Sequence, residues 1–311
     1  MPLSSRSYLR SFVDSAPIIG VLLAALALGG CSAVRLGYNS GPTLVYWWLD
    51  SYFDFDGEQT LRMRNDLLAV HDWHRKSEVP LLAQMLKDLQ GMAPKPVTTE
   101  QVCAIVIELQ TRLHVTLDRV TPTIAAIAPG LQSAQLEHIS QEFERRNSKW
   151  RKEWIDGTPA ERSERRVKQI VERVESFYGT LEPAQLTVVR AHIASSSFDG
   201  SRQLREMQRR HQDALQTLRK IRSGDTTPDR AGAEIRGLLE RTLKAPAPAY
   251  RRYMDQLTTE SCTALASLHN SSTPEQRTRL TQALKGYEED ARALAAQRPT
   301  DTATEQPPSP L

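Results

Sequence analysis

Two histidines in this sequence have a spacing that metal sites sometimes use. His71 and His74 are three residues apart on an expected helix, so their imidazoles would lie on one face. No third ligand is evident nearby, and Glu78 lies a further turn along the chain. We therefore expect histidines that are exposed or that cap a helix, and we predict no bound metal or cofactor.

A second candidate for chemistry is a segment rich in acidic and aromatic residues. Its members are Tyr46, Trp47, Trp48, Asp50, Tyr52, Phe53, Asp54, Phe55 and Asp56. Sugars stack on aromatic rings, and two carboxylates can act as acid and base, so the segment is the candidate cleft of an enzyme acting on wall or lipid substrates. Alternatively, the aromatic residues form core or lie at lipid headgroups, and the acidic residues start helices.

Other catalytic patterns are missing from the sequence. It contains no Gly-rich phosphate loop, no H-E-x-x-H and no Ser-His-Asp arrangement, so we name no nucleophile or base and do not expect an enzyme. The formal net charge is only +3, and the basic stretches 145–168 and 202–222 contain acidic residues at helical spacing. This balance predicts no nucleic-acid partner.

The first thirty residues have the layout of an export signal. Arg6 and Arg10 precede an apolar run over residues 16–28, which is too short to cross a bilayer unaided. Residues 28–31, Leu-Gly-Gly-Cys, resemble the lipobox of bacterial lipoproteins. This resemblance implies cleavage between Gly30 and Cys31 and acylation of the Cys31 thiol, which would anchor the chain to a membrane through covalent lipid. By the same likeness, Ser32 favours the periplasmic face of the outer membrane over the inner membrane.

Two further cysteines, Cys103 and Cys262, lie in apolar helical contexts. In an oxidising compartment they can form a disulfide, but spacing alone does not show proximity. Two separately buried thiols remain the alternative.

The apolar residues repeat at helical spacing along most of the chain. One expected face is traced by Val102, Ile105, Val106, Leu109, Leu113, Leu117 and Val120. Helix starts are indicated by Thr98, Thr158, Thr227 and Thr273, of which all but Thr227 are followed by Glu or Gln three residues later. The sequence therefore predicts an all-α fold, an irregular helical bundle or stacked helical hairpins of about nine or ten helices.

The domain organisation follows from these patterns. We expect a signal peptide at 1–30, a lipidated tether at 31–43 and a helical domain at 44–295. Two subdomains within it would be divided near 155–160 or 198–201. Residues 296–311 are polar and rich in proline, which predicts a disordered tail.

Two resemblances bear on function. Residues 31–60, together with the later WHRKSEVP and KWRKEW segments, resemble a family of uncharacterised Gram-negative lipoproteins catalogued as a domain of unknown function. This likeness implies a lipid anchor and a helical domain, and it implies no activity. Residues 97–101 and 273–276 look like the Leu-Thr-x-x-Gln signature of helical periplasmic stress chaperones, although a capping box gives the same letters.

We therefore expect a membrane-anchored envelope protein that serves as a non-catalytic binding or scaffold module. Its partner would be an unidentified envelope protein or a lipid headgroup. A chaperone-like protein of the periplasm and an enzyme acting on cell wall or lipid are the alternatives.

Overall fold

The computed structural model describes residues 31–223 and 227–297, and this part of the chain contains helices and no strand. The all-α prediction is confirmed. The first half contains α2 (Cys31–Asn39), α3 (Gly41–Phe53), α4 (Gly57–Ser77), α5 (Val79–Met92), α6 (Thr99–Ile127), the 3-10 helix η1 (Ala128–Gly130) and α7 (Ser133–Trp154). The second half contains α8 (Pro159–Tyr178), α9 (Pro183–Ser195), α10 (Gly200–Ser223), α11 (Pro228–Leu243), α12 (Pro248–Asn270) and α13 (Pro274–Ala296).

The expected number of nine or ten helices is too low, because the described residues form 12 α-helices. Residues 31–43, expected as a tether, form α2 and the first turn of α3, where Pro42 occupies a position that needs no intrahelical N–H bond. Pro80 has the same place in α5 and separates α5 from α4. The predicted signal peptide and residues 298–311 of the predicted tail lie outside the described residues.

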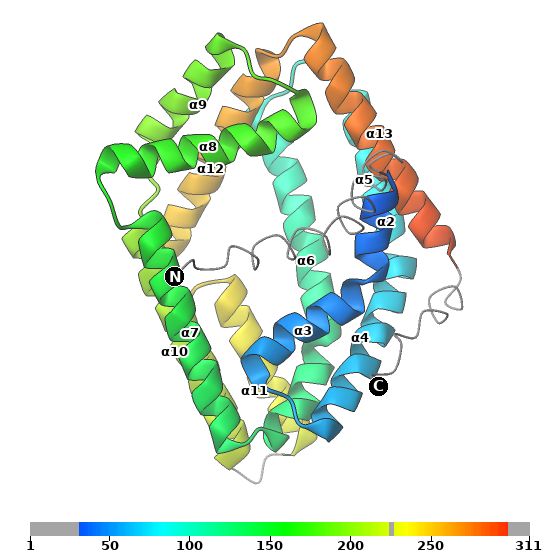
Figure 1. Cartoon of the computed structure of the whole chain (residues 1–311), viewed down its shortest axis with the longest axis vertical. Coiled ribbons are helices and arrows are strands. Elements are labelled where there is room, and N and C mark those ends of the chain that lie inside the picture. Colours follow the sequence, from blue (N-terminus) through cyan, green and yellow to red (C-terminus); the bar gives the residue numbers. More distant parts are fainter. Residues whose placement is uncertain (1–30, 224–226, 298–311) are drawn as a thin grey trace, which may run out of the picture.

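The helices form an elongated frame (Figure 1). Helices α7 and α10 pack together along one long edge, and α5 and α13 pack together along the other. At the upper end α13 contacts α8, and α9 contacts both α8 and α12, while α3, α4 and α11 lie in the lower half. Helix α6 runs lengthwise between these ends, with α12 against it at the top and α11 and α4 against it below.

The predicted helix starts are confirmed. Thr98, Thr158 and Thr273 each cap a helix and form a reciprocal box with the residue three positions later. Thr227 accepts a hydrogen bond from the Arg230 backbone N–H without a box, as the missing acid or amide predicts. Local side-chain chemistry therefore sets where these helices begin.

The lower corner of the frame joins residues 53–60 to residues 130–136 through a pair of buried glutamines. Gln59 and Gln135 each stand in the first turn of a helix, and each donates to the other's side-chain oxygen, at 3.3 and 2.7 Å. Gln135 also donates to the Phe53 carbonyl, and Gln59 donates to the Gly130 carbonyl. Two chain turns that are about seventy residues apart are thereby bonded together.

The upper corner joins residues 178–186 to residues 269–277 in the same way. Gln185 donates to Gln276 Oε1 at 2.8 Å, and Gln276 donates to Gln185 Oε1 at 2.9 Å. Gln276 also donates to the Thr180 carbonyl, and Gln185 is completely buried. Because buried amides need partners, each pair specifies how two helix N-termini meet.

Candidate binding site

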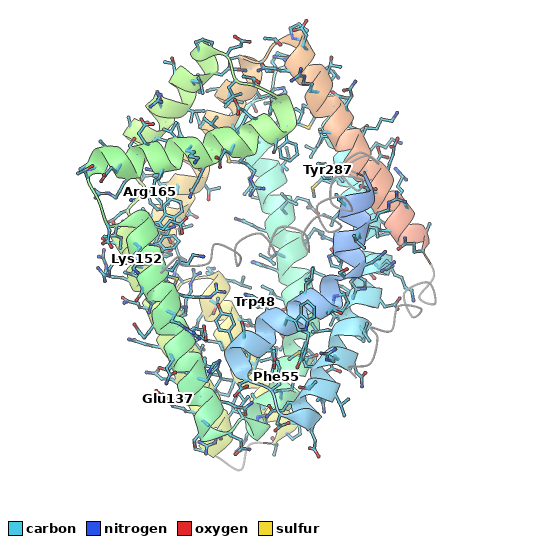
Figure 2. All side chains as sticks on the ribbon, in the orientation of Figure 1. Trp48, Phe55, Glu137, Lys152, Arg165 and Tyr287 are labelled. Atoms are coloured by element: carbon cyan, nitrogen blue, oxygen red, sulfur yellow. A yellow bond between two sulfur atoms is a disulfide. The ribbon has the colours of Figure 1, made fainter. Side chains whose placement is uncertain are left out.

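A cavity of about 350 Å³ lies beside the lower corner, between α3, α4 and α6. On its walls, α3 contributes Val45, Trp48 and Leu49, and α4 contributes Met63, Leu67 and Val70. Its volume is in the range of small-molecule sites. Figure 2 shows Trp48 on α3 and Phe55, another lining residue, just beyond the end of that helix.

The lining of the cavity is almost entirely carbon. Asp66 is its one charged residue, and the Asp66 carboxylate lies 3.6 Å from Nε of Arg62, one helical turn away. Thr123 is the other polar residue in the lining. An occupant therefore gains mainly from removing apolar surface from water.

Helix α6 supplies one wall of the cavity through a continuous apolar stripe. Leu117, Val120 and Ile124 line the cavity. One and two turns towards the N-terminus, Leu113 and Leu109 continue the same stripe but are 52% and 46% exposed. The buried residues of α6 all lie near its two ends, at Val102, Thr121, Ala125 and Ile127. The prediction that the whole face packs is therefore wrong in its middle, where no helix of the described chain covers it.

The aromatic segment of α3 divides between core and surface. Tyr46 and Tyr52 are buried, and Tyr46 donates to or accepts from the Thr60 hydroxyl at 3.0 Å. Trp47 and Trp48 are 59% and 53% exposed, and Leu44 is exposed beside them. The core interpretation thus holds for the tyrosines and fails for the tryptophans.

The acidic residues of this segment end and start helices. Asp50 accepts a hydrogen bond from the Phe55 N–H at 3.1 Å. Asp56 caps α4 by accepting from the Gln59 N–H, while Asp54 stands in the left-handed region at the end of α3. Asp56 therefore starts a helix, as the alternative interpretation predicted, whereas Asp50 bonds to the backbone just beyond the end of α3.

His71 and His74 both contact Tyr38 of α2. His71 Nε2 donates to the Tyr38 carbonyl, and the Tyr38 hydroxyl lies 3.0 Å from His74 Nδ1. Burial lowers the pKa of both imidazoles and raises the pKa of Tyr38 to about 12. Their expected role as exposed or capping residues is wrong, because they hold α2 against α4. Nowhere in residues 31–223 and 227–297 do three His, Cys, Asp or Glu side chains gather as metal ligands.

Cys103 and Cys262 are bonded to each other, with their Cα atoms 5.4 Å apart. This disulfide joins α6 to α12 just below the upper corner. The sequence left open a disulfide or two separately buried thiols, and the structure contains the disulfide.

The cavity was not predicted from the sequence. Its lining residues come from segments up to about 170 positions apart, Val45 and Leu218 at the extremes. The one sequence feature that pointed towards it was the apolar stripe on α6. This stripe continues at regular spacing beyond the part of α6 that other helices cover. No helix in the described ranges is both long and apolar enough to span a bilayer.

Comparison with known proteins gives one match. The model of a family of unknown function, DUF6279, matches residues 51–231. No curated protein matches the chain, and no solved structure matches it. The matched range includes α4, α6, most of the cavity and the whole lower corner.

Proposed function

The chain belongs to DUF6279, a family of unknown function, and we propose that it is a lipid-anchored protein of the cell envelope that acts as a non-catalytic binding module. The observation that carries this proposal is the apolar cavity, continued by the uncovered leucines of α6. Exposed apolar surface of this kind in a folded protein marks a site of interaction.

The lipid anchor is supported by a sequence motif, by two exposed tryptophans and by the disulfide. Residues 28–31 resemble a lipobox, and Cys31 is the first residue of α2. The exposed Trp47 and Trp48 follow within about twenty residues, and tryptophan favours the membrane interface. The bond between Cys103 and Cys262 is typical of proteins in oxidising compartments outside the cytoplasm. Placement at the periplasmic face of the outer membrane remains part of this proposal.

A binding role is favoured over catalysis by what the acidic residues do. Of the three carboxylates that an enzyme could use here, at Asp50, Asp54 and Asp56, those of Asp50 and Asp56 accept backbone hydrogen bonds at helix ends. The partner that we propose is an envelope protein or a lipid, bound through the apolar surface of α3 and α6.

A chaperone-like role is a second candidate, favoured by Leu109 and Leu113. Exposed leucines beside an apolar cavity can hold the apolar segments of an unfolded client. This role predicts that the full chain suppresses client aggregation and that Leu113→Ser weakens the suppression. Equal suppression of aggregation by the wild type and by Leu113→Ser would show that this surface does not hold the client.

Two measurements test the proposed function. Metabolic labelling with an alkyne fatty acid should mark the wild-type chain and leave Cys31→Ala unmarked; equal labelling of both would remove the anchor. A photoreactive residue at position 113 should crosslink specific partners in intact cells. The same residue at Lys149, exposed on α7, is the matched control, and equal crosslinking from both positions would contradict the binding surface.

A further inference from the structure

Building on this proposed function, we propose that the cavity between α3, α4 and α6 binds one saturated aliphatic chain of a membrane amphiphile. The inference concerns the class of ligand, which neither the family match nor the resemblances supply. It rests on the lining, the size and the continuation of the cavity.

The chemistry of the lining selects for an apolar ligand. Water inside an apolar lining of this kind has few hydrogen-bond partners, so an apolar group that displaces this water gains free energy. At the α3 side, Val45 and Trp48 are 42% and 53% exposed, while Met63 is buried. The cavity thus extends from partly exposed apolar residues to the core.

The charges around the cavity place the polar head outside it. Asp66 is paired with Arg62, and no second charged residue belongs to the lining. A carboxylate or phosphate deep in the cavity would lose its hydration without gaining a cation. Affinity therefore comes from the methylene groups, and the head remains at the exposed edge near Trp48.

The stripe on α6 extends the site. From Leu109 to Ile127 the helix rises by roughly 27 Å. The inner part of this length lines the cavity, and the outer part, at Leu113 and Leu109, is exposed. A chain longer than the cavity continues along these leucines, so the geometry suits a linear ligand.

The width of the site favours an alkyl chain over a partner helix. A helix with its side chains is about 10 Å across. The cavity lies among helices that pack against each other, α3 against α4 and α4 against α6. A flexible chain can enter such a space, whereas a helix can only insert single side chains.

The test uses the full-length protein in isolated membranes and a photoreactive dodecanoic acid with a terminal alkyne. Irradiation should label peptides from α3, α4 and α6, and unlabelled dodecanoic acid should compete. Among unlabelled acids from octanoic to dodecanoic, each added methylene should improve competition by about fourfold until the cavity is filled. Labelling spread evenly over exposed apolar residues such as Leu36 and Trp47 would overturn the proposal.

Variants that fill the cavity sharpen the test. Val70→Trp and Thr123→Trp place an indole in the lining from α4 and α6, at partly buried positions. Each should reduce labelling at least tenfold with an unchanged circular dichroism spectrum. Leu68→Trp, exposed on α4 outside the lining, should label within twofold of the wild type. Equal labelling of Leu68→Trp and a folded cavity variant would overturn the proposal.

A further arm identifies the source of the chain. If Cys31→Ala is labelled and the wild type is not, the cavity holds an acyl chain of the protein's own anchor, which supports the ligand class. Absence of labelling in both, with protein partners still crosslinked from position 113, would overturn the aliphatic ligand and leave the binding module standing. The two proposals therefore fail separately.

Discussion

The upper and lower corners of the frame both contain a pair of mutually bonded glutamines, but the residues around the two pairs differ. Each has a reciprocal pair of buried glutamines, Gln185 with Gln276 above and Gln59 with Gln135 below. Above, the disulfide lies nearby, and His269 links the Tyr178 hydroxyl to the Lys95 carbonyl. Below, the pair stands beside the apolar cavity.

One fold therefore combines a corner next to a disulfide with a corner that lines a cavity. The upper corner has a chain of hydrogen bonds through His269 and, nearby, the covalent bond between α6 and α12. The lower corner packs beside an apolar cavity, and a cavity lowers the stability of the structure that lines it. Binding sites are commonly drawn from such regions of lower local stability.

The largest effect is expected from removing the disulfide. Replacing Cys103 and Cys262 by alanine frees a loop with a sequence separation of 159 residues, and chain entropy predicts a loss of about 5 kcal/mol in the free energy of unfolding. Urea unfolding of the full chain measures it. A loss below about 1 kcal/mol would show that the upper corner does not depend on this bond.

The glutamine pairs come next. Gln185→Ala and Gln135→Ala each leave buried donors and acceptors without partners, so each should cost about 3 kcal/mol of unfolding free energy. Gln101, in the same box position of α6 but exposed, is the matched control and should cost about 1 kcal/mol or less. Similar losses at Gln101 and Gln185 would mean that reciprocal bonding adds nothing beyond capping.

Acid should weaken the upper corner through His269. Burial, with a further contribution from Arg277, lowers the pKa of this imidazole, which accepts from the Tyr178 hydroxyl and donates to the Lys95 carbonyl. The unfolded chain therefore takes up the proton first, and stability that is complete above about pH 6.5 is lost as the pH falls towards the folded pKa.

Urea midpoints at pH 7.5 and 5.5 measure this dependence. The decrease should be smaller in His269→Gln than in the wild type, with His114→Gln as the control for removing an exposed histidine. An equal decrease in wild type and His269→Gln would assign the acid sensitivity elsewhere.

The smallest effect on stability is expected at Leu113. Because this side chain is exposed on the uncovered stripe, Leu113→Ser should change the free energy of unfolding by no more than about 0.5 kcal/mol while reducing crosslinking of partners or ligand. Leu181→Ser, at a buried leucine of the upper corner, should be strongly destabilising. Comparable stability losses in both would mean that the stripe is structural.

Features that depend only on neighbouring residues, such as helix caps, could be predicted from the sequence. The caps at Thr98, Thr158 and Thr273 are local, because a hydroxyl and an amide three positions apart satisfy the same helix end. The glutamine pairs were not predicted, although Gln101 and Gln276 fell within the Leu-Thr-x-x-Gln likeness. Only the tertiary fold makes one cap side chain the partner of another.

The site was less predictable for the same reason. Apolar spacing on α6 indicated one face, and it could not indicate that Leu109 and Leu113 lack a covering helix. Likewise, Trp48 and Tyr52 are alike in type and four positions apart, and only the packing of α3 leaves the first exposed and buries the second.

Hydrogen exchange of the full-length protein, with and without dodecanoic acid, tests whether the lower corner is less stable and binds an aliphatic ligand. Without ligand, amides of the lower corner should exchange faster than those of the upper corner. Added ligand should slow exchange in α3, in α4 and in the second half of α6, and leave α9 and α12 unchanged. Uniform slowing over the whole chain, or no slowing around the cavity, would contradict a ligand site at the lower corner.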